Sequence, residues 1–380
     1  MELFDVYPLL DLEPIKGRGA YVYTENGTKY LDFYGGHGVI SVGHSHPHYI
    51  EAIETQLQKL GFYSNSVANP LQQELADKLG TLSDYGNYQL FLSNSGAEAN
   101  ENALKAASFH NGRSKVVTFK KSFHGRTSAA IGITDNEKYS APINERSKTT
   151  FLELNDTETL RQELADYETC AVVIEGIQGI GGIHIPEVDY FKKIRELCSQ
   201  TGTLLIIDEI QSGYGRSGRF FAHQHAGIEA DIVTVAKGMG NGFPVAGTII
   251  HPDIEAFHGE LGSTFGGNHL ACAAATSVLD ILENEELTQN AATTGQQLKD
   301  ELSTLSAIEE IRGLGLMIGI EFDFPINELR SQLIKNHHIL TGVSSNPNVL
   351  RLLPPLSIGL DEINQFIDAL QTVLKNSNFA

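Results

Sequence analysis

The sequence is short of positive charge, of cysteine and of long apolar stretches. Among its 380 residues, 27 lysines and arginines stand against 47 aspartates and glutamates, which gives a formal net charge of −20 at pH 7. Such an excess of negative charge repels nucleic acid and anionic membrane surfaces, so we expect neither as a partner. No stretch approaches the roughly 18 apolar residues that a membrane-spanning helix needs. If the substrates are anions, the site must concentrate positive charge locally.

The three cysteines, Cys170, Cys198 and Cys272, are widely spaced and odd in number. This is typical of buried thiols in a reducing compartment rather than of a disulfide framework. Residues 1–14 carry acidic side chains where a secretory signal has basic ones, and Pro8 interrupts their apolar run. We therefore expect a cytoplasmic protein.

The middle of the chain alternates short apolar runs with amphipathic helical patterns, such as Ala97–Phe109 and Val188–Gln200, the second ended by Gly202. Several runs are apolar at every position, as in strands buried on both faces of a parallel sheet. This alternation predicts the α/β class, with helices covering both faces of a mostly parallel sheet. The expected strands are Gln89–Leu92, Lys115–Phe119, Ala171–Ile174, Leu204–Ile207, Ile232–Val235 and Val245–Ile250.

The two ends of the chain differ from the middle. A hairpin is predicted in AYVYTENGTKYLDF, because Asn26 and Gly27 favour a tight turn between strands. We expect a large domain of residues 50–284 beside a smaller α+β domain built from 1–49 and 285–380. The elements expected in the C-terminal part are the helices Glu286–Leu302 and Asp361–Leu374 and the strands Met317–Phe322 and Val349–Leu352.

Two of the predicted strands lead into a charged residue at their carboxyl ends. Leu204–Ile207 runs into Asp208, and ligands bind at this edge of open α/β sheets, although capping of a following turn explains the aspartate equally well. Ile232–Val235 leads to Lys237 in a glycine-rich loop. Lysine is costly to bury, and Schiff-base chemistry, which needs a partly desolvated amine, is one reason to place it there. A head group that reaches solvent is the simpler alternative.

The residues Ser95, Gly96 and Ala97 lie between a predicted strand and a predicted helix. Free N–H groups at a helix N-terminus, next to small residues, form a cradle for phosphate. Plain capping by Ser95, with Glu98 three residues on in a capping box, is the alternative explanation.

A further group, Phe123, His124 and Arg126, follows the strand Lys115–Phe119. The aromatic ring can stack on a planar cofactor, and the guanidinium can bind a carboxylate through two hydrogen bonds. A pyridoxal-phosphate (PLP) enzyme needs a lysine, an acid for the pyridine nitrogen, a phosphate cradle and a group against the ring. The four segments together therefore predict PLP as the cofactor.

Over nearly its whole length the sequence resembles the class III, fold type I aminotransferases, and among them the group of acetylornithine and ornithine aminotransferases. The resemblance implies a mostly parallel seven-stranded sheet in the large domain, PLP as cofactor and a homodimer with shared active sites. The segments that carry it include YLDFYGGHGVISVGHSHP, SNSGAEANENALKAA, SFHGRTSAAIGIT, LLIIDEIQSGYGRSGRFFA, AKGMGNGFPVAG, GSTFGGNHLACAAA and VLRLLPPL.

This resemblance implies a role for each residue around the ring of PLP. Lys237 is expected to bind the cofactor as a Schiff base and to shuttle the proton. Asp208 is expected to pair with the pyridine N–H, and Gln211 to contact the phenolic oxygen. Phe123 is expected to stack on the ring, with His124 beside it as a supporting residue.

The phosphate of PLP is implied to lie against Ser95, Gly96 and Ala97. Thr264, in GSTFGGN, is implied to reach the phosphate bound by the neighbouring subunit. One chain would then not complete its own site, which is why the resemblance implies a homodimer.

The same resemblance gives the residues expected to bind substrates. Arg126 is expected to bind the carboxylate of an ornithine-type donor, and Arg351 the α-carboxylate of glutamate or 2-oxoglutarate; Ser263 is the third expected contact. One position departs from the family, which usually reads E-P-x-Q-G-E-G-G where this chain has Ile180 in place of the second glutamate. In relatives that glutamate pairs with the arginine during one half-reaction, so its absence leaves open how this chain alternates between substrates.

Four histidines, His37, His44, His46 and His48, gather in one loop and could suggest a metal site. The matching loop of the family carries histidine without a metal, so we expect none here.

The resemblance implies transfer of the δ-amino group of N-acetylornithine to 2-oxoglutarate, which gives N-acetylglutamate semialdehyde and glutamate, as in arginine biosynthesis. N-Succinylornithine and free ornithine are alternative donors, with Ser64, Asn65 and Ser66 as candidates for the acyl pocket. The same fold also serves racemases, an aminomutase and a decarboxylase. The second carboxylate binder, Arg351, favours a transferase, and a requirement for 2-oxoglutarate would discriminate. A binding protein without catalysis is a third alternative, which Lys237 and the phosphate cradle disfavour.

Overall fold

The computed structural model describes residues 1–144 and 148–376, and the part it describes contains three β-sheets. The largest has seven strands, of which β10 (Ala246–Ile250) runs in the opposite direction to the other six. This confirms the predicted α/β class with a mostly parallel seven-stranded sheet. In spatial order its strands are β4 (Gln89–Ser93), β10 (Ala246–Ile250), β9 (Ile232–Val235), β8 (Leu204–Asp208), β7 (Thr169–Glu175), β5 (Lys115–Phe119) and β6 (Thr149–Leu152).

All six strands predicted in this region are present, and β6 is the one that the sequence did not reveal. It lies at the edge of the sheet, where three of its four residues are only half-buried. An edge strand of this kind needs no continuous apolar run, so it lacks the pattern that predicted the others.

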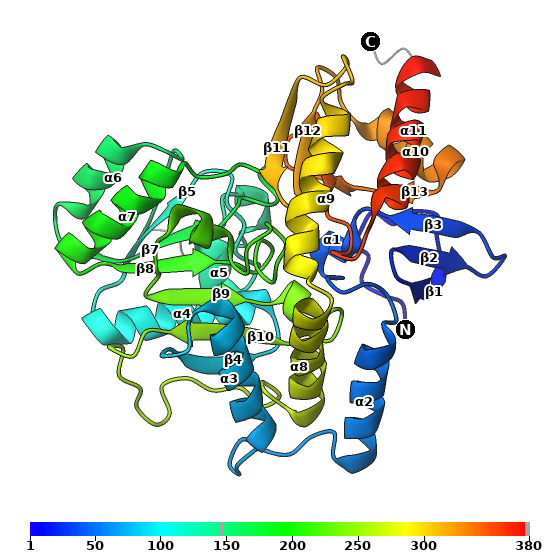
Figure 1. Cartoon of the computed structure of the whole chain (residues 1–380). Helices are drawn as coiled ribbons and strands as arrows, with labels where there is room; N and C mark the ends of the chain where they lie inside the picture. The colour runs from blue at the N-terminus through cyan, green and yellow to red at the C-terminus, as the bar shows by residue number, and fades with distance from the viewer. Residues whose placement is uncertain (145–147, 377–380) are drawn as a thin grey trace.

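Both faces of the sheet are covered, because alternate residues of a strand point to opposite sides. Every residue of β7 is buried. Val172 packs in the same cluster as Ile194 of α7, whereas Val173 packs with Ala103 of α4 on the other side. Figure 1 shows the helices on either side of the green strands. The helices of this region are α2 (Pro47–Lys59), α3 (Pro70–Ser83), α4 (Gly96–Asn111), α5 (Ser128–Gly132), α6 (Thr157–Leu164), α7 (Val188–Thr201) and α8 (His269–Asn284), with 3-10 turns η1 (Glu137–Tyr139), η2 (Ala222–Ala226) and η3 (Lys237–Met239).

The two chain ends form the other two sheets. The predicted hairpin is present as β2 and β3, and the short strand β13 adds to it in parallel, pairing Ile339 with Leu31. The stacked rings of Phe33 and Phe366, 4.9 Å apart, also join the ends. One sheet has the order β1 (Pro14–Arg18), β2 (Tyr21–Thr24), β3 (Lys29–Asp32), β13 (Ile339–Leu340), and the other β11 (Glu310–Leu314), β12 (Met317–Glu321), β15 (Val349–Leu352), β14 (Gly342–Val343).

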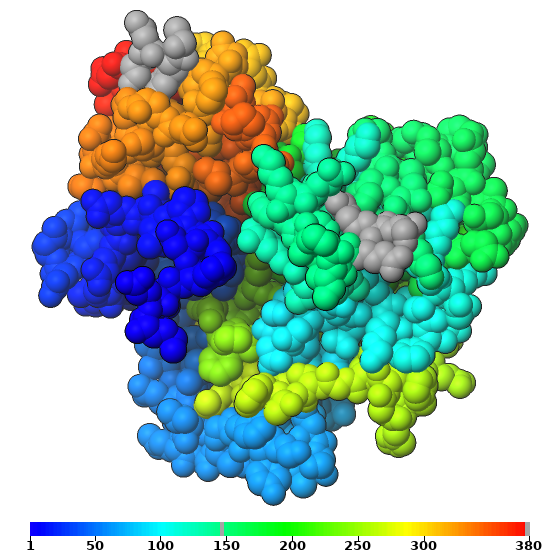
Figure 2. All heavy atoms as spheres, turned by 180° about the vertical axis from the view of Figure 1, so that it is seen from behind, coloured from blue at the N-terminus to red at the C-terminus, as the bar shows by residue number. Residues whose placement is uncertain are grey.

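Four helices accompany these sheets, and the dark-blue N-terminal residues adjoin the orange C-terminal ones on one side of the molecule (Figure 2). The predicted domain boundaries after residues 49 and 284 stay a prediction. No helix within the described residues is long and apolar enough to span a bilayer. The four helices are α1 (Gly35–Gly38), α9 (Leu287–Leu302), α10 (Asn327–His337) and α11 (Leu360–Asn376).

Candidate active site

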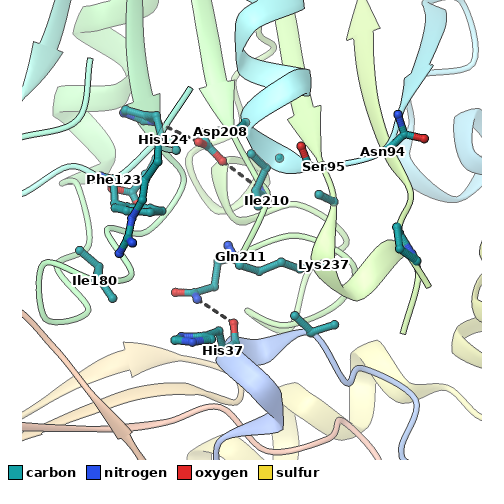
Figure 3. A pocket seen from close by; sticks show the side chains of 18 of the residues that line it. His37, Asn94, Ser95, Phe123, His124, Ile180, Asp208, Ile210, Gln211 and Lys237 are labelled. Carbon is teal, nitrogen blue, oxygen red and sulfur yellow. Dashed lines mark hydrogen bonds and ion pairs between the residues drawn. The ribbon is translucent and has the colours of Figure 1, made fainter. Parts of the chain in front are cut away.

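A cavity of about 550 Å³ opens at the carboxyl ends of β7, β8 and β9, against the N-terminus of α4 (Figure 3). This is the edge at which open α/β sheets bind their ligands. The structure brings most of the sequence-predicted site residues to the wall of this one cavity. They are Ser95, Gly96, Ala97, Phe123, His124, Arg126, Asp208, Gln211 and Lys237.

Asp208 ends β8 and is almost completely buried. Its Oδ1 accepts a 3.0 Å hydrogen bond from the N–H of Ile210, so the local turn that the sequence allowed for does exist. Its Oδ2 lies 2.8 Å from Nδ1 of His124 and accepts a 2.8 Å bond from the side-chain amide of Asn100. A buried carboxylate held by three groups is fixed in direction, so the aspartate does more than cap a turn.

Asn100 is a residue of this site that the sequence reasoning missed. It lies on the buried face of α4, one turn after Gly96. Its amide nitrogen also donates to the carbonyl of His124, and its oxygen accepts from the hydroxyl of Thr234, each at 2.8 Å. The signal available in the sequence was a polar side chain at helical spacing from the glycine, on a face otherwise made of alanines.

Lys237 follows β9 and adopts a left-handed backbone conformation with φ of 44°. Its side chain lines the cavity instead of reaching the outer surface (Figure 3). Burial lowers the pKa of its amine, and nearby Arg351 lowers it further, while Asp208 and Glu175 oppose the shift. The amine is therefore more readily neutral than that of an ordinary lysine, which nucleophilic chemistry requires.

The N-terminus of α4 is capped by Ser95, whose hydroxyl accepts from the N–H of Glu98 at 3.3 Å. The predicted capping box is not closed, because the Glu98 carboxylate binds the N–H and the side chain of Asn94 instead. The first N–H groups of a helix have no partner within it, and here Gly96 and Ala97 line the cavity. A Cβ atom on Gly96 would lie 2.8 Å from Cδ1 of Ile210, so the absence of a side chain at Gly96 lets Ile210 pack closely against this turn.

Glu175 is a second buried carboxyl at the site, also missed in the sequence. It ends β7 directly beside Asp208 on β8. Its two oxygens accept from the N–H groups of Phe123 (3.0 Å) and Gly179 (2.9 Å), and so it holds two walls of the cavity. Burial raises its pKa to about 7; the proximity of His124 opposes this and that of Asp208 adds to it.

The two predicted carboxylate binders differ in surroundings. Arg126 is exposed at the cavity, with its guanidinium 4.2 Å from the ring centre of Tyr139. Arg351 is fully buried in β15 behind the wall, where it donates to the carbonyl of Val343 and, at 3.3 Å, to Oε1 of Gln211. Its Nη2 has no hydrogen-bond partner within the described residues. Burial lowers the pKa of Arg351 to about 10, which leaves it charged at neutral pH.

The remaining predicted contacts lie outside this cavity. The hydroxyl of Ser263 accepts from the side chain of Asn94 (3.2 Å) and from the N–H of Gly266 (2.9 Å), and Thr264 is exposed. Of the proposed acyl-pocket residues, Asn65 donates to the carbonyls of Ser263 and Gly266, beside these residues. Their roles stay predictions, because they concern a neighbouring subunit or a bound substrate.

The histidines of the N-terminal loop have separate partners. His44 bonds Asp32 at 2.8 Å, whereas His37 lines the cavity. His46 and His48 bind carboxylates of the Asp280–Glu285 region at the end of α8. Within the described residues, no three His, Cys, Asp or Glu side chains are grouped as metal ligands would be.

The sequence profile of the family Aminotransferase class-III matches residues 7–374. The chain belongs to the class III aminotransferases. It is 39% identical to the acetylornithine aminotransferase of Methanosarcina mazei over 94% of this chain and 90% of that protein. It is also 39% identical to the Bacillus subtilis acetylornithine aminotransferase over 98% of this chain and 97% of that protein. Among solved structures, the ornithine aminotransferase of Toxoplasma gondii matches with a TM-score of 0.89 at 30% identity, over 98% of this chain and 94% of the other.

As a class III aminotransferase, the chain is a PLP-dependent enzyme of fold type I. The cavity fits this cofactor, because it offers a buried acid for a pyridine nitrogen, an amine with a lowered pKa for an aldehyde, and a helix N-terminus with a glycine at its first position for a phosphate. The predicted family, fold, enzyme class and cofactor are thereby confirmed.

Proposed function

We propose that this class III aminotransferase moves the δ-amino group of an N-acylornithine, in the first place N-acetylornithine, to 2-oxoglutarate. The observation that carries the proposal is the pair of arginines around Lys237: Arg126 on the cavity wall and Arg351 directly behind Gln211. Both substrates are carboxylates, and a strongly acidic protein must bind them with such guanidinium groups. The names of the M. mazei and B. subtilis relatives support the acetylated donor.

In this proposal Lys237, Asp208, Phe123 and the turn at Ser95–Ala97 hold the cofactor. Bound PLP supplies an electron sink for the carbon that carries the transferred amino group. Asp208, locked by Asn100 and His124, keeps a proton on the pyridine nitrogen, since a fixed carboxylate favours the cationic form.

The chain's own acid–base group is Lys237. Because its amine has a lowered pKa, it can take the proton from the donor carbon that carries the amino group. In the second half-reaction it gives a proton to the α-carbon of the keto acid. Glu175 positions two parts of the cavity wall, because its two hydrogen bonds hold the backbone of Phe123 and the turn at Gly179 that leads to Ile180. Arg126, braced against Tyr139, anchors the carboxylate of the donor.

The function is tested with a panel of amino donors, namely N-acetylornithine, N-succinylornithine and free ornithine, with 2-oxoglutarate as acceptor. We expect the acetylated donor to give the highest kcat/KM, and turnover to stop when 2-oxoglutarate is omitted. Turnover of any donor without a keto acid would favour a racemase or a mutase instead.

We also propose that the active unit is a cytoplasmic homodimer in which Thr264 completes the neighbouring site. An exposed aromatic pair next to it supports this: Phe62 and Phe265, 43% and 60% exposed, have ring centres 5.4 Å apart. Apolar surface of this kind marks interfaces. A mixed dimer of Lys237→Ala and Thr264→Ala chains would then contain one intact site and regain activity. If Thr264 serves its own chain, neither site is intact and no activity returns.

A further inference from the structure

The turn that carries His37 has an unusual backbone. Gly35, Gly36, His37 and Gly38 all have positive φ, of 55°, 55°, 67° and 74°. Only glycine adopts this left-handed conformation without cost, and His37 is the one member of the turn with a side chain. Strain of this kind persists where the surroundings impose it, and it is concentrated at functional sites. The turn is well suited to glycine, so the presence of histidine needs an explanation.

The imidazole of His37 is held at the cavity. Its carbonyl accepts a 2.8 Å bond from Nε2 of Gln211, which fixes the backbone. The hydroxyl of Tyr34 lies 2.6 Å from Nδ1 and 2.7 Å from Nε2, and it can bond only one of these ring nitrogens at a time. Figure 3 shows the ring below Gln211, on the side of the cavity where Ile180 also lies.

His37 also belongs to the surroundings of Arg351. Gln211 bridges the two residues, since its Oε1 accepts from Arg351 while its Nε2 donates to His37. His37 is exposed at the cavity, but partial desolvation there, followed by the charges of Arg351, Lys237 and Arg126, lowers its pKa to about 4. The ring is therefore neutral at neutral pH, and its N–H donates a hydrogen bond without adding a further charge.

The binding place at Arg351 is otherwise short of donors and acceptors. The Nη2 of Arg351 has no partner within the part of the chain that is described, and Ile180 offers no polar side-chain atom. A carboxylate that reaches Arg351 would thus meet Gln211, whose Oε1 and Nε2 each already take part in one hydrogen bond, and the imidazole of His37 on the cavity wall.

We propose that His37 is a specificity-determining residue: its neutral imidazole donates a hydrogen bond to the α-carboxylate of the amino acid and keto acid that dock at Arg351. The inference rests on the proposed function, in which glutamate and 2-oxoglutarate form the second substrate pair. The N-acylornithine donor, anchored at Arg126 and presenting its δ-amino group, does not use this contact.

The test compares half-reactions of the purified holoenzyme. Single-turnover absorbance changes are measured with L-glutamate and separately with N-acetylornithine for wild type, His37→Gly and His37→Asn. His37→Gly should lower the apparent second-order rate constant for glutamate by about tenfold to a hundredfold, as for a lost hydrogen bond to a charged group, and that for N-acetylornithine by less than about threefold. Asparagine tolerates the same left-handed backbone and retains a hydrogen-bond donor. The rate constant of His37→Asn for glutamate should therefore lie between those of wild type and His37→Gly.

Two further measurements distinguish the loss of a contact with the carboxylate from a loss of folding stability. Calorimetric titration of the holoenzyme with glutarate, an unreactive dicarboxylate, should show a Kd about tenfold higher in His37→Gly. The thermal unfolding midpoint of His37→Gly should equal or exceed that of wild type, because glycine relieves the left-handed strain. The matched control is Ser45→Gly, which relieves the same kind of strain (φ 52°) at an exposed position of the same loop outside the cavity. It should leave both half-reactions unchanged.

Three results with His37→Gly would overturn the role of His37. They are an equal decrease of the rate constants for glutamate and N-acetylornithine, an unchanged rate constant for glutamate, and a lower unfolding midpoint. A wild-type enzyme that reacts with glutamate but not with N-acetylornithine would overturn the proposed donor, while the glutamate and glutarate measurements still decide on His37. A wild-type enzyme inert toward glutamate would overturn the His37 proposal.

Discussion

The side-chain amide of Asn100 donates a 2.8 Å hydrogen bond to Oδ2 of Asp208, and both side chains are buried. The same amide holds the carbonyl of His124, whose ring bonds the same oxygen of the aspartate. The acid that we propose to face the cofactor is thus aimed by a residue on α4, the helix whose N-terminus is the proposed phosphate cradle. One rigid element thereby positions the two ends of the cofactor site.

Asn100→Ala should lower kcat by about tenfold with little change in KM, because Asp208 loses a charge-assisted hydrogen bond but stays in place. We also expect a loss of about 1–3 kcal/mol in the free energy of unfolding, since the Thr234 hydroxyl is left without its partner. Steady-state kinetics and urea unfolding check this. The control is Asn102→Ala on the same helix, because the side chain of Asn102 donates to the carbonyl of Glu98 and does not line the cavity. Equal effects of the two substitutions would show that Asn100 has no special role.

Lys237→Ala should reduce steady turnover by roughly 10⁴-fold or more, since the variant has neither the amine nor its acid–base function. Cofactor should still bind through the helix N-terminus, with a changed absorbance spectrum. Lys121→Ala is a suitable control, because Lys121 also has a left-handed backbone (φ 65°) but lies outside the cavity. Retention of transaminase activity by the Lys237 variant would remove this lysine from the mechanism.

The raised pKa of Glu175 makes stability depend on pH. The carboxyl holds its proton up to about pH 7 in the folded chain but only to about 4.5 in the unfolded one. The folded state therefore binds more protons between these values, and its stability falls as the pH rises through that window. Because Gln cannot ionise, the free energy of unfolding of Glu175→Gln should rise relative to wild type by about 2–3 kcal/mol between pH 5 and pH 8. Urea unfolding of the cofactor-free proteins measures this, and a constant difference would place the titration elsewhere.

Ile180→Glu should slow the glutamate half-reaction by about tenfold and the N-acetylornithine half-reaction much less. Ile180 lines the cavity, and the preceding Gly179 lies against Gln211, which Arg351 binds. The Nη2 of Arg351 lacks a partner within the described residues. A carboxylate at position 180 would mask this guanidinium from an incoming α-carboxylate, which isoleucine cannot do. The control is Ile180→Gln, because glutamine has the same length as glutamate but carries no charge. An unchanged glutamate rate would mean that Arg351 is already masked or does not bind the carboxylate.

The sequence by itself determined the local elements and the residues whose signals are local. The turn at Asn26–Gly27 follows from the backbone preferences of these two residues. In the same way, α7 ends at Gly202, which adopts a left-handed φ of 64°. Asp208 was recognisable because it directly follows an apolar strand, and Lys237 because it lies two residues beyond a mostly apolar one.

Only the tertiary structure decided which side chains share the cavity. The strands β7, β8 and β9 are neighbours in the sheet, and the parallel register of β7 and β8 places Glu175 beside Asp208. The pairing of β13 with β3 joins segments about 300 residues apart, near the turn of His37. Glu175 follows the apolar run Ala171–Ile174 just as Asp208 follows Leu204–Ile207, and Asn100 lies at helical spacing from Gly96, but these patterns do not show which groups the side chains bind. His37 carries no distinctive local pattern. The environment of all three residues is made by residues distant in sequence, because burial, hydrogen-bond partners and electrostatic fields act through space and not along the chain.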